Sequence, residues 1–205
     1  GQRRLEDRQR LAQLHRAALE LTQDPEDLVG RAPLDLLGHD LGRPPADPLP
    51  DAQGGLGRRH YTVRRYDPAR RLVDIDVVMH GDSTPATRWA LGSLPGDEVL
   101  AFGPRGRNTL HEGADWRVFI GDETAIPGFF GMIEILPAGS RARAIIEIQS
   151  DADRQDVAAA ADLDLTWLSR DGAHAQPSSP RLIEVIKSCE PPPGVYVIAG
   201  ASWMS

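Results

Sequence analysis

The chain changes rhythm near residues 107–115, and this change constrains its fold more than any other feature of the sequence. Before that point, short runs of strand-forming residues are separated by turn residues such as Pro, Gly and Asp. After it, apolar runs that suit strands alternate with runs that suit helices. The sequence therefore predicts a β half followed by an α/β half, and it contains no internal repeat.

The β half is defined best by an alternating run at residues 73–79. Its apolar positions fall on one face of a strand, whereas Asp74, Asp76 and His80 fall on the other. A strand buried on one side is typical of an antiparallel sheet or barrel. The same half contains two further predicted strands, at residues 60–63 and 98–102, and one short predicted helix at residues 87–91.

The α/β half opens with a strand at residues 117–120, a helix at 126–136 and a strand at 144–148. Such a unit implies parallel strands joined by a right-handed crossover. Gly128 and Gly131 weaken the helix, because glycine is a poor helix former. The remaining predicted elements are a strand at 163–168, a helix at 181–188 and a strand at 195–199.

The first 57 residues resemble neither half. Residues 5–22 repeat Leu and Ala at helical spacing, which predicts an amphipathic surface helix packed on the rest of the chain. Residues 31–57 are rich in Pro and Gly, which predicts a long surface loop. We therefore expect three regions: residues 1–57 leading into the β domain, the β domain at 58–112, and the α/β domain at 113–205.

Composition excludes several functions. A single cysteine rules out a disulfide framework and a multi-cysteine zinc site, and it fits a reducing compartment. The formal net charge of −7 makes nucleic acid a poor partner, because binding phosphates requires clustered positive charge. No run approaches the roughly 18 apolar residues of a membrane span. The opening residues lack the apolar stretch of a secretory signal, so the cytoplasm is the expected location.

The first candidate for binding is the strand RHYTVR at residues 59–64. Alternation places Arg59, Tyr61 and Val63 on one face. An arginine beside an aromatic ring could hold a phosphate while the ring stacks on a flat heterocycle, and Thr62 could bond a ring nitrogen. The arginines also belong to a basic run at residues 58–71, for which a solvated face is the ordinary interpretation.

The second candidate is the turn HGDSTPATRWA at residues 80–90, where a strand ends and a helix begins. The free N–H groups at the start of a helix bind anions such as pyrophosphate. Ordinary capping of the helix by Thr84 or Thr87, with Trp89 in the core, explains the same residues equally well.

The third candidate is GDET at residues 121–124, after the first strand of the α/β half. Open parallel sheets bind ligands at this end of their strands, although the GxGxxG fingerprint is absent. Asp122 and Glu123 would repel a nearby phosphate but suit the start of a helix, so a structural role is also open. Ala199 and Gly200 end the last strand, and we expect them beside this segment.

Other chemistries do not fit the sequence. The six histidines lack the spacing of metal ligands, so no metal site is expected. The sequence contains no GxSxG elbow and no P-loop. Cys189 has no nearby partner, which favours a buried or incidental thiol over a catalytic one.

Together, and in this order, these segments resemble the siderophore-interacting protein family, which are FAD-dependent ferric-siderophore reductases of the ferredoxin–NADP reductase superfamily. The resemblance rests on RHYTVRRYD, VDIDVVMHGDSTPATRWA, PGDEVLAFGPRG, ADWRVFIGDETAIP and GVYVIAG, within residues 58–200. It implies a Greek-key antiparallel β barrel that binds FAD, followed by an open parallel-sheet α/β domain like those that bind NAD(P)H. It departs at residues 5–22, where the family has barrel strands, and at Ser205, where the chain stops short of the family's final helix.

The resemblance also implies roles for individual residues. Arg59 would contact the flavin phosphates, the Tyr61 ring would pack on the isoalloxazine, and Thr62 would lie near its reactive nitrogen. No protein side chain is expected to be catalytic, because the flavin carries the chemistry. The other expected cofactor contacts are Val63 on the same strand, His80, Gly81, Pro85, Ala86 and Thr87 around the pyrophosphate, Gly121, Asp122, Glu123 and Thr124 at the mouth of the NAD(P)H domain, and Ala199 and Gly200 beside them.

The implied function is the reduction of a ferric siderophore, which releases iron as Fe(II), with electrons from NAD(P)H or ferredoxin. Two other interpretations stay open. One is a truncated, non-catalytic paralogue that acts as a binding or regulatory module. The other is a binder of polyanions through the basic run at residues 58–71, which the overall negative charge argues against.

Overall fold

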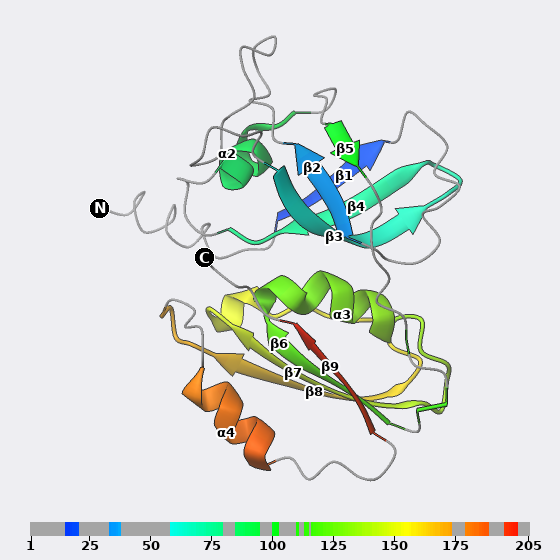
Figure 1. Ribbon diagram of the computed structural model, residues 1–205, viewed down its shortest axis with the longest axis vertical. Helices are drawn as coiled ribbons and strands as arrows, with labels where there is room; N and C mark the ends of the chain where they lie inside the picture. Colours follow the sequence, from blue (N-terminus) through cyan, green and yellow to red (C-terminus); the bar gives the residue numbers. More distant parts are fainter. Residues whose placement is uncertain are drawn as a thin grey trace. The chain divides into compact units, whose positions relative to one another are not determined.

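The computed structural model describes residues 15–20, 33–37, 58–79, 85–94, 100–102, 110, 113–114, 116–173, 179–188 and 195–200. The chain divides into two compact units, residues 1–109 and 110–205. Each unit contains one sheet in its described part, antiparallel in the first and parallel in the second (Figure 1). The predicted combination of an antiparallel β domain and an α/β domain is therefore confirmed.

The first unit is a five-stranded sheet in the order β1-β4-β3-β2-β5. Strands β2, β3 and β4 are consecutive neighbours, and β1 returns beside β4, which is the Greek-key arrangement expected from the resemblance. The helix α2 lies between β4 and β5 in the sequence. The elements are β1 (His15–Glu20), β2 (Pro33–Leu37), β3 (Arg58–Asp67), β4 (Leu72–Val77), α2 (Pro85–Gly92) and β5 (Leu100–Phe102).

Strand β1 contradicts the helix predicted over residues 5–22. It pairs antiparallel with β4, so that Ala17 lies opposite Ile75 and Leu19 lies opposite Val73. Ala, Leu and Glu favour a helix locally. The edge of β4, however, presents backbone N–H and C=O groups that a neighbouring strand satisfies. Tertiary pairing therefore outweighs local propensity here, and the rest of the predicted helix lies outside the described residues.

Strand β2 corrects the prediction that residues 31–57 form only a loop. It pairs with β3 on one side and with β5 on the other. Pro33 is its first residue, a position where a strand tolerates the missing N–H of proline. The sheet thus recruits a short apolar run from a segment whose proline content suggested irregular structure.

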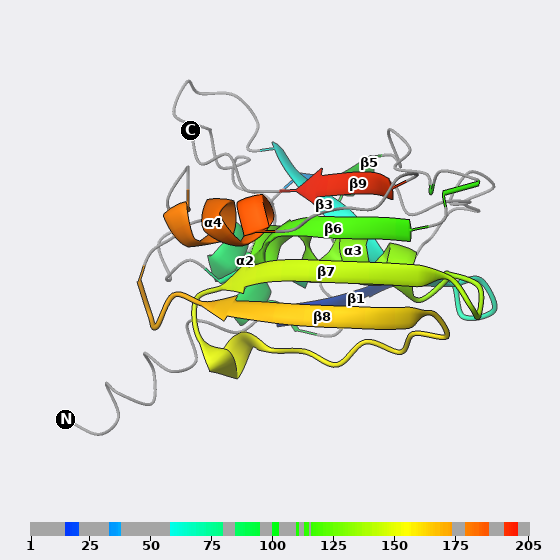
Figure 2. The same ribbon diagram turned by 90° about the horizontal axis from the view of Figure 1, so that it is seen from below.

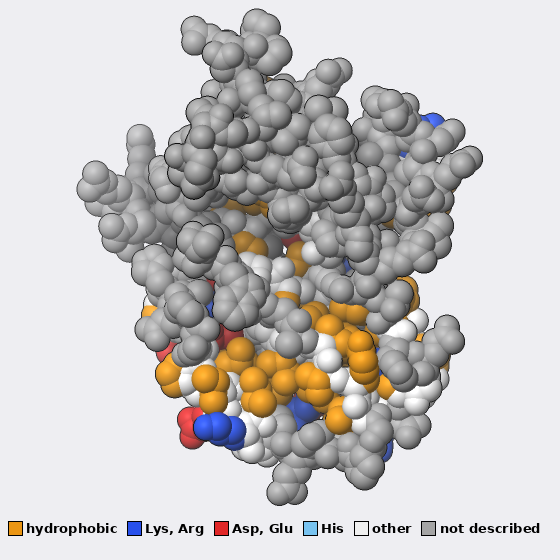
Figure 3. Space-filling model, in the orientation of Figure 1, with side chains coloured by type: hydrophobic (Ala, Val, Ile, Leu, Met, Phe, Trp, Pro, Cys, Tyr) orange, Lys and Arg blue, Asp and Glu red, His pale blue; other side chains and the backbone are white. Residues whose placement is uncertain are grey.

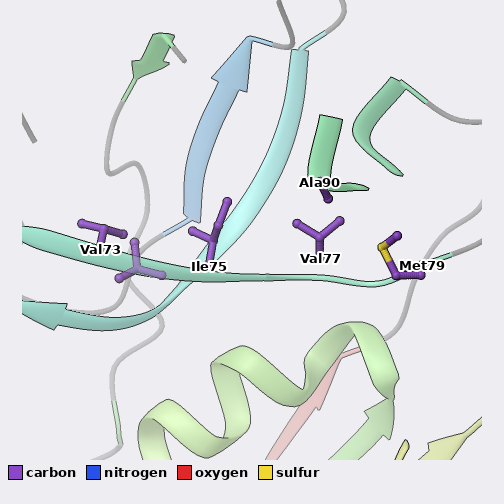
Figure 4. Packing of buried hydrophobic residues seen from close by; sticks show 6 residues of the cluster. Val73, Ile75, Val77, Met79 and Ala90 are labelled. Carbon is purple, nitrogen blue, oxygen red and sulfur yellow. The ribbon is translucent and has the colours of Figure 1, made fainter. Parts of the chain in front are cut away.

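The core of the first unit lies on the apolar face of β4, as the alternation predicted. Val73, Ile75 and Val77 are buried there, and Met79 continues the series beyond the strand (Figure 4). Ala90 of α2 points toward the same cluster. The partly buried rings of Tyr61, Tyr66 and Trp89 pack against these residues together with buried Val63.

A β-bulge in β3 sets which of its side chains enter this core. Val63 lies opposite Ile75, but Arg65 lies opposite Asp74, so Arg64 is the extra residue of the bulge. Without it, Arg65 would lie opposite Val73 on the core face. With it, Tyr66 takes that place and packs on the core, while Arg65 is exposed.

The second unit is a parallel sheet in the order β8-β7-β6-β9, built from the predicted strand–helix–strand unit and its continuation (Figure 2). The elements agree with the predicted ones to within a few residues, except that the helix α3 ends earlier than expected. They are β6 (Trp116–Asp122), η2 (Glu123–Ala125), α3 (Ile126–Ile133), β7 (Arg141–Ile148), η3 (Asp151–Asp153), β8 (Asp162–Ser169), α4 (Pro180–Ser188) and β9 (Val195–Gly200).

The helix α3 forms the core of this unit with the sheet. Phe129 contacts Phe119 of β6 with ring centroids 5.4 Å apart, and Phe130 meets Trp167 of β8 edge to face at 6.1 Å. Phe119 and Phe130 are fully buried. Aromatic burial on this scale compensates for the poor helix propensity of Gly128 and Gly131.

Hydrophobic side chains also gather on the surface of the second unit on the face seen in Figure 3. Its exposed large apolar residues include Ile183 and Ile186 of α4 and Val197 of β9, which is 50% exposed. The strand β9 is an edge strand of the four-stranded sheet in the described part of the chain. Among the described residues, no helix combines the length and the apolar character needed to cross a membrane.

Candidate functional site

The first candidate surface is carried by β3. Tyr61 and Thr62 are partly buried, and Val63 is fully buried in the core. The predicted sharing of a face by Tyr61 and Val63 is confirmed, because both pack on the same cluster. The backbone of Arg59 pairs with Leu36 of β2, whereas its side chain lies outside the described part of the chain.

The start of α2 lies in the same unit. Pro85 is its first residue, Thr87 is buried, and its first turn contains no acidic residue. Such a terminus suits a phosphate, because the helix dipole is favourable and no carboxylate repels the anion. His80 and Gly81, and the side chains of Pro85 and Ala86, lie outside the described residues. The alternative placement of Trp89 against the core is observed, so both interpretations of this turn remain compatible with the fold.

The groups described in this unit suit the binding of a flavin. A half-buried phenol ring, a neighbouring hydroxyl and an acid-free helix start are the groups that a flat ring system and a diphosphate require. The roles expected for Arg59, Tyr61, Thr62, Val63, His80, Gly81, Pro85, Ala86 and Thr87 stay predictions.

A buried ion pair in the same unit was not predicted from the sequence. The bulge residue Arg64 and Asp76 of β4 are only 3% and 5% exposed, and Arg64 Nε lies 3.9 Å from Asp76 Oδ2. The prediction that the basic run forms a solvated face is therefore wrong for Arg64, which is buried. Asp76 is buried as well, although the alternation places it on the polar face of β4. A signal was present, since apolar positions 61, 63 and 66 break the period of two at the bulge.

The second candidate surface lies at the carboxyl end of the parallel sheet. Asp122 ends β6, and its Oδ1 accepts hydrogen bonds from Thr124 N at 2.9 Å and Thr124 Oγ1 at 2.5 Å. Gly200 of β9 pairs with Gly121, and Ala199 pairs with Ile120. The fold thus brings the two predicted segments of this half together, although their roles toward a nucleotide stay predictions.

Glu123 at this edge is held by an arginine that sequence reasoning missed. Arg170, which follows β8, donates from Nη1 to Glu123 Oε2 at 2.8 Å and from Nη2 to Glu123 Oε1 at 2.5 Å. Its Nη1 also donates to Glu147 Oε2 of β7 at 3.4 Å. Ser179 Oγ donates to the other carboxylate oxygen of Glu147. Three neighbouring strand ends are therefore joined through one guanidinium.

Burial and neighbouring groups shift the pKa values of two residues in and beside this cluster. Burial alone would lower the pKa of Arg170, but the hydrogen bonds and charges of Glu123 and Glu147 raise it on balance, so the guanidinium stays ionised. Burial raises the pKa of Asp153, against hydrogen bonds from Ser150 that lower it. No arrangement of three or more His, Cys, Asp or Glu suited to a metal ion occurs within the described ranges.

A cavity of about 360 Å³ opens beside this cluster. Its lining includes Glu147, Arg170, Ser179 and Arg181 from the ends of β7, β8 and the start of α4. Arg181 Nη1 donates to the carbonyl oxygen of Ser169 at 2.5 Å. This is the edge at which open parallel sheets bind ligands.

Comparisons with known proteins agree with both units. The siderophore-interacting FAD-binding domain matches residues 42–108, and the siderophore-interacting protein domain matches residues 114–204. Ferric vibriobactin reductase ViuB of Vibrio cholerae is 35% identical over 126 residues, which are 62% of this chain and 46% of ViuB. The chain therefore spans less than half the length of this curated relative.

Two solved structures have a similar fold over most of this chain. A siderophore utilization protein from T. fusca is 30% identical with a TM-score of 0.76, covering 93% of this chain and 76% of that one. The siderophore-interacting protein SipS from Aeromonas hydrophila is 26% identical with a TM-score of 0.74, covering 93% and 74%. The fold and the matched FAD-binding domain place the chain among two-domain flavoproteins. Within that class, it belongs to the siderophore-interacting protein family.

Proposed function

We propose that this protein is an FAD-dependent oxidoreductase that reduces ferric siderophores, with NAD(P)H as the favoured electron donor. The observation that carries the proposal is the presence in one chain of a sheet matched by a siderophore-interacting FAD-binding domain and a parallel sheet with a polar, cavity-bearing carboxyl edge. The relative ViuB, named a ferric vibriobactin reductase, supports the substrate class. We place the reaction in the cytoplasm.

The first unit would bind FAD through β3 and the start of α2. In this proposal Arg59 holds the flavin phosphates, the Tyr61 ring packs on the isoalloxazine and the Thr62 hydroxyl lies near its reactive nitrogen. The half-buried state of Tyr61 and Thr62 supports this, because groups needed for both packing and ligand contact must be partly accessible.

The turn before α2 would surround the pyrophosphate. His80 and Gly81 would contribute at its beginning, and Pro85, Ala86 and Thr87 at the first turn of the helix. The absence of an acidic residue from that turn supports the assignment.

When bound, FAD accepts a hydride as an electron pair and passes electrons singly, which is the chemistry needed to reduce Fe(III) from a hydride donor. The ferric siderophore is the substrate, and each iron takes one electron. Hard oxygen ligands bind Fe(II) more weakly than Fe(III), so reduction loosens the chelate. The protein's own groups hold and orient the reactants rather than take part in bond making.

An anaerobic assay tests this function. FAD-loaded protein is mixed with NADH or NADPH, a ferric siderophore and an Fe(II)-specific chromophoric chelator, and chelated Fe(II) is followed by absorbance. We expect Fe(II) to form at a rate proportional to protein, with none from flavin-free protein. Reduced ferredoxin in place of the nucleotide identifies the alternative donor. No Fe(II) with any of the three donors contradicts the proposal.

A further inference from the structure

The buried Glu123–Arg170–Glu147 cluster takes no part in the chemistry described above, and its construction is unusual. The side chains of Glu123, Glu147 and Arg170 are 8%, 5% and 9% exposed. Buried ion pairs add little net stability, because desolvation offsets most of the attraction. A cluster of this kind at a ligand-binding edge therefore calls for an explanation other than stability.

The hydrogen bonds of Arg170 show that it is fixed rather than free to bind a ligand. Both Nη atoms donate to Glu123, and Nε donates to the carbonyl oxygen of Ala173 at 3.2 Å. Its backbone N–H donates to Ile148 O at 2.9 Å, which anchors the end of β8 to β7. Because hydrogen bonds fix both its backbone and its side chain, the guanidinium of Arg170 stays directed at the carboxylates of Glu123 and Glu147.

The charge balance of the cluster is unfavourable for an anionic ligand. Two carboxylates face one guanidinium, so a net negative charge remains even with Arg170 present. A nicotinamide dinucleotide carries a negatively charged pyrophosphate. A carboxylate near its binding site repels the pyrophosphate, and the repulsion grows with the part of the carboxylate's charge that no cation compensates. Without Arg170, two buried carboxylates would face the carboxyl edge of the sheet.

We infer that Arg170 is a positioning residue for the electron donor. Its guanidinium compensates the charge of Glu123 and links that side chain to Glu147. This makes the segment at residues 121–124, where β6 ends and η2 begins, accessible to an anionic dinucleotide. This inference rests on the proposed function. This segment is also kept in place locally, since Asp122 caps η2 by accepting a hydrogen bond from Thr124 N, and η2 leads into α3. Arg170 thus acts through Glu123 and does not contact the donor itself.

The test measures steady-state, anaerobic reduction of a ferric siderophore by the FAD-loaded full chain over a range of NADH and NADPH concentrations. Arg170→Met keeps an unbranched side chain in place of the aliphatic part of the arginine but removes the guanidinium and its charge. We expect KM for the donor to rise by about tenfold, while kcat at saturating donor stays within about twofold, because the loss is in approach and binding. The surface variant Arg154→Met is the matched control, since Arg154 forms an exposed ion pair with Asp151 in the same unit.

The double variant Arg170→Met/Glu123→Gln separates charge from architecture. It removes one uncompensated carboxylate without restoring any hydrogen bond of Arg170, so we expect KM to return most of the way toward the wild-type value. A double variant as impaired as Arg170→Met, or an Arg170→Met with unchanged KM, overturns the inference while leaving the proposed function intact. A wild-type protein that neither nucleotide reduces overturns the NAD(P)H assignment and this inference with it. Iron reduction from reduced ferredoxin in the same sample would then show that the flavin enzyme itself survives.

Discussion

The ion pair between Arg64 and Asp76 allows a sharp test of the bulge in β3. In the variant Arg64→Met, the side chain of Asp76, which is 2% exposed in the wild type, loses the guanidinium that lies 3.9 Å away. Removing one partner of a buried ion pair costs about 3–5 kcal/mol, because the remaining charge loses a favourable interaction while it stays out of water. The free energy of unfolding of a typical domain is about 5–15 kcal/mol, so the first unit should lose a large share of its stability.

Amide hydrogen exchange read by mass spectrometry measures this loss locally. Since about 1.4 kcal/mol corresponds to a factor of ten, peptides from β3 and β4 should lose about two to four decades of protection. Peptides from β6 and β7 should be unchanged, because they belong to the other compact unit. This internal comparison avoids treating a two-unit chain as a single unfolding transition.

Two further variants control the experiment. Arg65→Met removes an exposed neighbour opposite Asp74 and should change stability by no more than about 0.5 kcal/mol. The double variant Arg64→Met/Asp76→Asn removes both charges and should recover most of the loss, because a buried amide is far less costly than a buried carboxylate. The reasoning is refuted by a loss below about 1 kcal/mol in the single variant, or by a double variant as unstable as the single.

Three other expectations concern the core, the pH response and the flavin. Phe130→Ala should destabilise the second unit by about 3–5 kcal/mol in urea unfolding, whereas the exposed Ile135→Ala should have little effect; equal losses would contradict the assigned core. Asp153→Asn should gain stability relative to wild type as pH rises above 3.8, the ordinary pKa of an aspartate, because the folded-state pKa of Asp153 is raised and ionising it favours unfolding. A pH-independent difference in unfolding free energy between the two would contradict that shift. Arg59→Ala should weaken FAD binding by about 1.5–3 kcal/mol, or one to two decades in Kd by fluorescence titration, with Arg65→Ala as the control; equal affinities would remove Arg59 from the phosphates.

Features carried by local pattern were predictable from the sequence. The alternation of residues 73–79 correctly located the buried face of β4, and the strand–helix–strand spacing correctly gave a parallel sheet. The segment at residues 121–124 was correctly placed at the end of β6, although its first two residues belong to the strand and the rest to η2, because polar residues after a buried strand are recognisable without knowledge of the fold.

Features that depend on partners distant in the sequence were missed. Strand β1 consists of residues that prefer helices, and only its pairing with β4 makes it a strand. Arg170 is 47 residues from Glu123 along the chain, so no local spacing reveals their bidentate pairing. The buried state of Arg64 follows from a one-residue bulge, which a strict period of two does not anticipate.

Direct titration of the flavin-free full chain with FAD tests the central claim most directly. We expect saturable quenching of flavin fluorescence at a single FAD per chain, a flavin absorption spectrum that stays with the protein through gel filtration, and bleaching of that spectrum by NADH or NADPH without air. A chain that leaves FAD unquenched and elutes colourless after incubation with excess FAD would contradict the account.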